Sequence, residues 1–166
     1  MPEPSDYWVE FRDRLHELGD EPVLIGALAA SLYRAEPRRT TDVDFLVRSL
    51  DGIVETFTAA GYEVRTVADE DGRPYVAYIR GHGHRVDAIV AETAYQHEAI
   101  DRATGGVLTV EDVIVHKLLA WRPRDRDDIS SILSAGPTLD SGYIERWAHE
   151  WDVTDRWGEA QAASGR

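Results

Sequence analysis

Apolar residues near the start of the chain recur with the period of a helix. Their spacing of three and four residues places one apolar stripe on a helix over residues 5–19, and Gly19 supplies a stop signal. The residues of this stripe are Trp8, Phe11, Leu15 and Leu18. The pattern therefore predicts an amphipathic helix before the first strand.

Short apolar or alternating runs, bounded by glycine and other turn residues, predict the strands that follow. These runs cover residues 23–25, 43–47, 62–67, 75–79 and 85–91. The last two predict a hairpin around the turn Gly-His-Gly-His at residues 81–84. Helices are expected between the strands at residues 27–34 and 52–60.

Beyond residue 92 the pattern becomes helical. A short apolar run at residues 108–110 predicts one further strand, and the remaining elements are helices. The helices are expected at residues 111–121, 125–133, 140–151 and from 155 into a polar tail. Together the elements predict an α+β fold, with a mixed β-sheet, flanking helices and a helical C-terminal portion.

The length and composition predict one folded domain over residues 1–166. Within it we expect a core at residues 1–105, a helical part at 106–151, and a terminal helix and tail at 152–166. The chain has no cysteine, so disulfides and thiolate metal sites are excluded. No apolar run approaches the length of a membrane span, and the first residues do not form a signal peptide. We therefore expect a cytoplasmic protein with no membrane partner.

The net charge of −13 argues against broad electrostatic attachment to nucleic acids or to anionic membranes. Of the 18 basic residues only Lys117 is a lysine, which a high-GC codon bias would largely explain.

Asp42 and Asp44 are the strongest candidates for chemistry. They flank Val43 at the start of a predicted strand, so both carboxylates should point to the same face while Val43 points into the core. Like charges this close repel each other unless a cation lies between them, and hard ions such as Mg²⁺ prefer such oxygen ligands. The alternative is that one aspartate caps a turn and the other faces solvent.

Asp87 lies in an otherwise apolar predicted strand and is a candidate third carboxylate. The alternative is a surface ion pair with Arg85. Gly26 and Ala27 lie where a strand meets the first turn of a helix, where free backbone N–H groups can hold a phosphate. A lone glycine at such a turn is more often structural.

Lys117, between apolar neighbours on a predicted helix, could direct its ammonium group at a phosphate. The alternative is a surface lysine whose stem covers apolar atoms. In the next helix Asp125 fits a capping role, whereas Asp127 or Asp128 could orient Lys117.

Other candidates are weaker. His82 and His84 could bind a metal in a hydrolase, but a polar turn fits better because no further ligand has zinc-site spacing. Trp147 and Trp151, one helical turn apart, are expected to pack in the core rather than to stack on bases.

Four segments, taken in order, resemble the nucleotidyltransferase superfamily with its polymerase-β-like fold, and most of all its AbiEii-like toxin branch and minimal relatives. They are Val-Leu-Ile-Gly-Ala (23–27), Arg-Arg-Thr-Thr-Asp-Val-Asp (38–44), Arg-Val-Asp-Ala-Ile (85–89) and Lys-Leu-Leu-Ala-Trp-Arg-Pro-Arg-Asp-Arg-Asp-Asp (117–128). The resemblance implies a nucleotidyltransferase core in which the turn at Gly26 and Ala27 holds a triphosphate. Ala27 departs from the family, which usually has glycine or serine there.

The resemblance also implies roles for individual residues. Asp42, Asp44 and Asp87 would bind Mg²⁺ (or Mn²⁺), Lys117 and Asp128 (less so Asp127) would support activity, and Arg38 and Thr40 would lead into the aspartate pair. The implied activity is transfer of a nucleoside monophosphate from a nucleoside triphosphate to an acceptor hydroxyl. Candidate acceptors are a tRNA 3′ end, as in toxin-like members, a protein or a small molecule.

A toxin of a toxin–antitoxin or phage-defence system would also have a cognate antitoxin protein as partner. The arginines that could line an acceptor groove are Arg34, Arg38, Arg39, Arg122, Arg124 and Arg126. The other class of function is a catalytically inactive nucleotidyltransferase fold that binds a nucleotide or a partner. Ala27 favours that reading, and the complete aspartate set opposes it.

Overall fold

The computed structural model describes residues 7–165, which form eight helices and one five-stranded sheet. The elements are α1 (Tyr7–Glu17), β1 (Val23–Ile25), α2 (Gly26–Tyr33), β2 (Asp42–Val47), α3 (Ile53–Ala59), β3 (Glu63–Ala68), β4 (Pro74–Gly81), β5 (His84–Val90), α4 (Ala94–Arg102), α5 (Val110–Ala120), α6 (Pro123–Ser134), α7 (Ser141–Glu150) and α8 (Thr154–Ala163). The predicted α+β fold with a mixed sheet and a helical C-terminal portion is confirmed. The predicted first residues of α1, 5 and 6, lie outside the described part of the chain.

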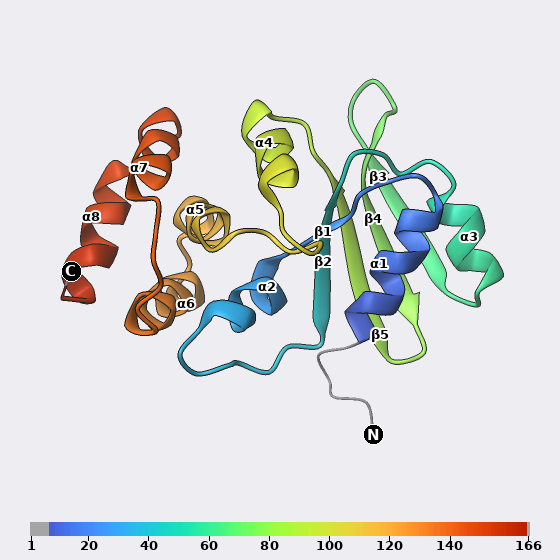
Figure 1. Ribbon diagram of the computed structural model, residues 1–166. Helices are drawn as coiled ribbons and strands as arrows, with labels where there is room; N and C mark the ends of the chain where they lie inside the picture. Colours follow the sequence, from blue (N-terminus) through green and yellow to red (C-terminus); the bar gives the residue numbers. More distant parts are fainter. Residues whose placement is uncertain (1–6, 166) are drawn as a thin grey trace.

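The sheet has the strand order β1-β2-β5-β4-β3. The predicted hairpin of β4 and β5 is confirmed, and only β2 and β5 pair in parallel. Figure 1 shows α1 and α3 on one face of the sheet, whereas α2, α4 and α5 lie toward the other, with α6, α7 and α8 beyond them.

Side chains of the two faces of the sheet differ in character, as strand alternation requires. Val43 and Phe45 of β2 point to the face covered by α1 and α3, and both are fully buried. Phe11 of α1 and Phe57 of α3 stack there with ring centroids 5.9 Å apart. The opposite face therefore carries the polar residues of β2.

One predicted strand is wrong. Residues 108–110 do not form a strand; instead the chain makes a single bridge between Val107 and Leu24 of β1. Leu108 N donates to Leu24 O, and Thr109 then caps α5 by accepting from Asp112 N. Leu108 is buried beside β1, but the helix cap stops the run from continuing along the strand.

No helix within residues 7–165 is long and apolar enough to cross a membrane.

Candidate active site

Three aspartates meet on one face of the sheet. Asp42 and Asp44 lie two residues apart on β2, and the parallel pairing with β5 sets Asp44 directly opposite Asp87 and Asp42 opposite Arg85. All four side chains line one cleft of about 830 Å³. The structure thus brings together the three carboxylates that the sequence singled out, although Asp87 is 43 residues from Asp44 in the chain.

The carboxyl group of Asp44 has a raised pKa. Burial, and then the negative charges of Asp87 and Asp42, raise the pKa of its carboxyl to about 6, although Lys117 and Arg122 act in the opposite direction. Burial and the neighbouring carboxylates thus disfavour the ionised form of Asp44. A bound cation would relieve that charge.

Asp87 pairs with Arg80 rather than with Arg85. Its Oδ1 atom lies 2.7 Å from a terminal nitrogen of Arg80, and the same guanidinium donates to the carbonyls of Ile79 and Val86 at 3.0 and 2.8 Å. The alternative pairing of Asp87 with Arg85 is wrong, because Arg85 lies 3.5 Å from Asp42.

The donor set fits a hard divalent cation in part. Oδ1 of Asp87 is buried and accepts no hydrogen bond of good geometry from the described residues, despite its contact with Arg80. A buried carboxylate oxygen on the strand position opposite Asp44, whose own pKa is raised, is a suitable cation ligand. However, no three histidine, aspartate or glutamate side chains in residues 7–165 already converge on one point, and Asp87 is paired with Arg80.

The backbone of Gly26 packs directly against the carboxylate of Asp44. It starts α2 with a φ of +72°, in the left-handed region that favours glycine, and a β-carbon there would collide with Oδ2 of Asp44. Gly26 and Ala27 both line the cleft, so the free N–H groups of the first turn of α2 lie beside the aspartates.

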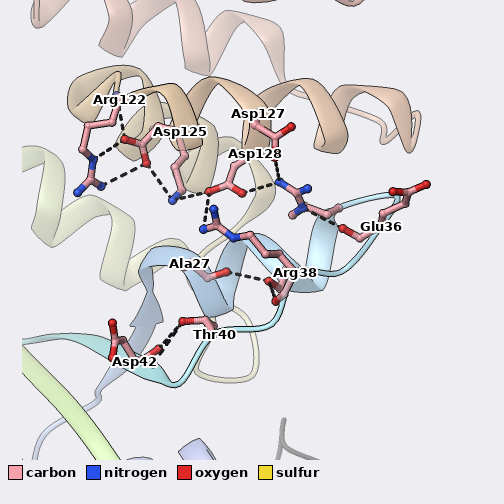
Figure 2. A network of polar contacts seen from close by, with 12 residues as sticks. Ala27, Glu36, Arg38, Thr40, Asp42, Arg122, Asp125, Asp127 and Asp128 are labelled. Atoms are coloured by element: carbon pink, nitrogen blue, oxygen red, sulfur yellow. Dashed lines mark hydrogen bonds and ion pairs between the residues drawn. The ribbon is translucent and has the colours of Figure 1, made fainter.

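Arg38 and Thr40 line the cleft next to the same turn. Thr40 Oγ1 accepts from the Asp42 backbone N–H at 3.3 Å, which fixes the start of β2 (Figure 2). The predicted lead-in therefore lies beside the carboxylates, and its hydroxyl holds the backbone there.

Lys117 projects from α5 into the wall of the same cleft and is buried. Its Nζ atom lies 3.1 Å from Oδ1 of Asp125 and 2.8 Å from Oδ2 of Asp128. The alternative of a solvated surface lysine is wrong. Asp125 does more than cap α6, because it also accepts from Arg122 at 2.7 Å through its other oxygen (Figure 2).

The helical phase of α6 decides between Asp127 and Asp128. Asp128 is fully buried and also pairs with Arg34 at 2.6 Å and with Arg38 at 3.5 Å, whereas the Asp127 side chain is 65% exposed and contacts Arg34 alone. Asp128 does not line the cleft, so it acts on the cleft by holding Lys117. Figure 2 shows both aspartates on α6 above Arg38.

The arginines predicted for an acceptor groove separate into two groups. Arg38, Arg39, Arg122 and Arg124 line the cleft. Arg34 is instead committed to Asp127 and Asp128, and Arg126 lies over the Trp121 ring, away from the cleft. Neither residue lines the cleft, and the buried guanidinium of Arg34 is not free to meet a ligand. The Arg126 side chain is half exposed, so a role in an acceptor groove stays a prediction for it.

Seven basic side chains line the cleft against four aspartates, in a chain whose net charge is −13. The basic residues are Arg38, Arg39, Arg80, Arg85, Lys117, Arg122 and Arg124. Positive potential is thus concentrated at one place on an acidic protein, which suits an anionic ligand.

Sequence reasoning missed several residues of this cleft, among them Arg80 and His116. Arg80 of β4 lies opposite Arg85 of β5 in the hairpin, and its contact with Asp87 depends on this strand register. His116 precedes Lys117 and stacks edge-on against Tyr95; burial lowers its pKa to about 4, so it is neutral at physiological pH. No periodic signal in the sequence marks either residue.

The two hairpin histidines lie apart from this chemistry. His84 stacks on Tyr7 with centroids 4.8 Å apart, on the face covered by α1, and His82 packs edge-on against Tyr62. Both imidazole rings therefore pack against aromatic side chains rather than lining the cleft.

The two tryptophans of α7 have different surroundings. Trp147 packs against Tyr95 at 4.9 Å, as expected of a core residue. Trp151 is 40% exposed and lines the cleft, so the core-packing expectation is wrong for it.

No protein-family model and no curated protein sequence matches this chain. Among solved structures, the chain is similar to a crystal structure of an antigenic nucleotidyltransferase-like protein from Paracoccidioides brasiliensis. The two chains are 17% identical, with 98% of this chain and 92% of the other covered, and the TM-score is 0.54. The likeness in fold agrees with the resemblance inferred from the sequence, and the chain has a nucleotidyltransferase-like fold.

Proposed function

We propose that the protein is a Mg²⁺-dependent nucleotidyltransferase, with Mn²⁺ as a substitute, that moves a nucleoside monophosphate from a nucleoside triphosphate to an acceptor hydroxyl. One observation carries the proposal. Asp44 lies opposite Asp87 across parallel strands, beside Asp42 and against the Gly26 turn, in a cleft that Lys117 also lines.

Different residues of the chain would take different roles in such a transfer. Asp42, Asp44 and Asp87 would hold the cation, which supplies charge neutralisation on the phosphates and aligns the acceptor with the α-phosphorus. The backbone N–H groups at Gly26 and Ala27 would donate to phosphate oxygens.

Lys117 would place positive charge beside the departing diphosphate, held in position by Asp125 and Asp128. The acceptor oxygen forms the new bond to the α-phosphorus as the bond to the diphosphate breaks. The proton of the acceptor hydroxyl passes to one of the site's carboxylates.

For the acceptor, we propose first a tRNA 3′ end, as the resemblance to AbiEii-like toxins suggests. The support is the group of cleft arginines, Arg38, Arg39, Arg122 and Arg124, which could contact phosphates of a nucleic acid end. A toxin of this kind, in a toxin–antitoxin or phage-defence system, would be neutralised by a cognate antitoxin protein. A protein hydroxyl and a small molecule are the alternative acceptors.

A second candidate is a catalytically inactive nucleotidyltransferase fold that binds nucleotide or a partner. Two observations favour it: Ala27 lacks the side chain or backbone freedom expected at the phosphate turn, and Asp87 is paired with Arg80. It predicts cation-dependent nucleotide binding with no transfer.

The test is label transfer from each α-³²P-labelled nucleoside triphosphate, with Mg²⁺, to tRNA, total protein and small-molecule fractions. Asp44→Ala is run beside the wild type, and Asp71→Ala, an exposed turn residue away from the cleft, is the matched control. Label on one fraction with wild type and Asp71→Ala, absent with Asp44→Ala, supports the enzyme and names its acceptor. Equal labelling by Asp44→Ala would overturn the mechanism, and binding without labelling would favour the second candidate.

A further inference from the structure

Trp151 is an aromatic ring left open in a polar cleft. It is 40% exposed, and it lines the same cleft as Asp44 and Lys117. Aromatic side chains carry a large apolar surface, and in water such a surface gains free energy when another ring or an apolar group covers it.

The other four tryptophans each have a structural reason for their place. Trp8, Trp121 and Trp147 have an arginine guanidinium over the ring, at 5.4, 4.9 and 4.6 Å from the centroid, and Trp157 is only 3% exposed. Trp151 has no aromatic or cationic partner on its ring within the described residues. Packing within the protein therefore does not explain why a tryptophan ring is exposed at this position.

The turn between α7 and α8 fixes the backbone at Trp151. Val153 N donates to Ala148 O at 2.7 Å and Asp152 N donates to His149 O at 3.1 Å, which is the hydrogen-bond pattern of a Schellman motif. Asp152 takes the left-handed position with a φ of 54°, and Val153 is buried. Because the backbone at Trp151 is fixed in this way, a ligand that binds the ring has only the side chain left to order.

Trp151 shares its cleft with both charged and apolar side chains. His116, Leu119 and Ala120 of α5 line the same cleft, and His116 is uncharged at neutral pH. The cleft thus combines the carboxylates, the basic side chains and the Gly26 turn with an open aromatic ring and apolar side chains. A nucleoside triphosphate has the same combination of charged phosphates and a flat, largely apolar base.

We propose that Trp151 is the stacking surface for the base of the bound nucleoside triphosphate, an inference that rests on the proposed function. Stacking on an aromatic ring tolerates every base, because each base has a π-face. Trp151 therefore contributes affinity for nucleotides as a class, and ring size makes purines gain more from it than pyrimidines.

The experiment compares nucleotides with a ligand that has the phosphates but no base. ATP, GTP, CTP, UTP and inorganic tripolyphosphate are titrated by calorimetry, with Mg²⁺, into wild type, Trp151→Ala and Trp151→Phe. Tyr75→Ala is the matched control, since Tyr75 is a similarly exposed aromatic at 37% and does not line the cleft. Circular dichroism and thermal melting check that each variant is folded.

Stacking predicts that Trp151→Ala weakens the best-bound nucleoside triphosphate by about 10-fold. Tripolyphosphate binding should not change, Trp151→Phe should recover most of the loss, and Tyr75→Ala should match wild type. Nucleotide affinity that is equal in Trp151→Ala and wild type would overturn the inference and leave the proposed function standing. So would an equal loss for nucleotide and tripolyphosphate, which would mean a general change in the cleft. If wild type binds neither ligand, the proposed function itself fails.

Discussion

The backbone of Gly26 and the side chain of Asp44 occupy adjoining space with no room for a β-carbon between them. Such an atom on Gly26 would lie 3.0 Å from Cγ of Asp44 and closer still to Oδ2. Because Gly26 also has a φ of +72°, the residue at this turn is constrained twice, by its backbone and by the carboxylate it faces.

Gly26→Ala is therefore expected to disturb the site more than the fold. The strain of a left-handed alanine and the displacement of Asp44 together should cost about 1–3 kcal/mol of stability, and label transfer should fall by more than about tenfold. Chemical denaturation and the transfer assay measure the two effects.

Gly19→Ala is the control for that variant. Gly19 has a φ of +87° but no atom within 4 Å of its added β-carbon, so it carries the backbone strain without the collision. It should lose about 1 kcal/mol of stability and keep its activity. Equal loss of activity in both variants would mean that the contact with Asp44 does not matter.

Asp44→Asn should stabilise the cation-free protein at alkaline pH. The folded state raises the pKa of Asp44 from 3.8 to about 6, so its contribution to folding is most favourable below pH 4 and is lost as the pH rises through 6. Asparagine never ionises, so the variant should gain about 1–3 kcal/mol over wild type at pH 8, after allowance for partial exposure. That gain should shrink toward zero near pH 4.

Thermal melts at both pH values, with and without Mg²⁺, make the measurement. Mg²⁺ should raise the melting temperature of wild type at pH 8, since it binds the folded state, and should do so less in Asp44→Asn. Asp71→Asn, at an exposed turn, should follow wild type throughout. A variant that is less stable than wild type at pH 8 would contradict the charge repulsion inferred at this site.

Substitution of the two neighbouring aspartates of α6 should lower the free energy of unfolding by very different amounts. Asp128→Ala removes the fully buried partner of Lys117 and Arg34, and the uncompensated charges should cost about 3–5 kcal/mol. Asp127→Ala removes an exposed partner and should cost less than about 0.5 kcal/mol. Urea denaturation of the pair tests the difference, and similar losses would mean that the buried network is not formed in solution.

Arg80 and the cation should compete for Asp87. In Arg80→Gln the carboxylate loses the guanidinium 2.7 Å away, so Mn²⁺ affinity should rise several-fold. Titration followed by electron paramagnetic resonance measures free Mn²⁺ without any need for turnover. Arg73→Gln, on the exposed turn before β4, is the control, and unchanged affinity in Arg80→Gln would exclude Asp87 as a ligand in competition with Arg80.

Strand alternation was enough to predict that Asp42 and Asp44 share a face, because that geometry is local. Their meeting with Asp87 depends on the parallel pairing of β2 with β5, which the sequence indicates only through the resemblance. The choice between Asp127 and Asp128 needed the exact phase of α6, since adjacent helical residues point about 100° apart.

Trp151 could not be placed from periodicity for a different reason. A spacing of four from Trp147 puts both rings on one helical face only while the helix continues, but α7 ends at Glu150. Trp151 takes the cap position, and its ring leaves the buried stripe for the cleft. Helix ends are where an amphipathic pattern stops giving the direction of a side chain.

The cleft is assembled from segments spread between Gly26 and Trp151, which gives its parts an order of arrival during synthesis. A nascent chain that has folded only its sheet would already contain the three aspartates and the turn at Gly26. It would still lack the ammonium of Lys117 and the ring of Trp151, which come with α5 and the end of α7. An incomplete chain would thus hold the three carboxylates with only part of the basic side chains that line the finished cleft.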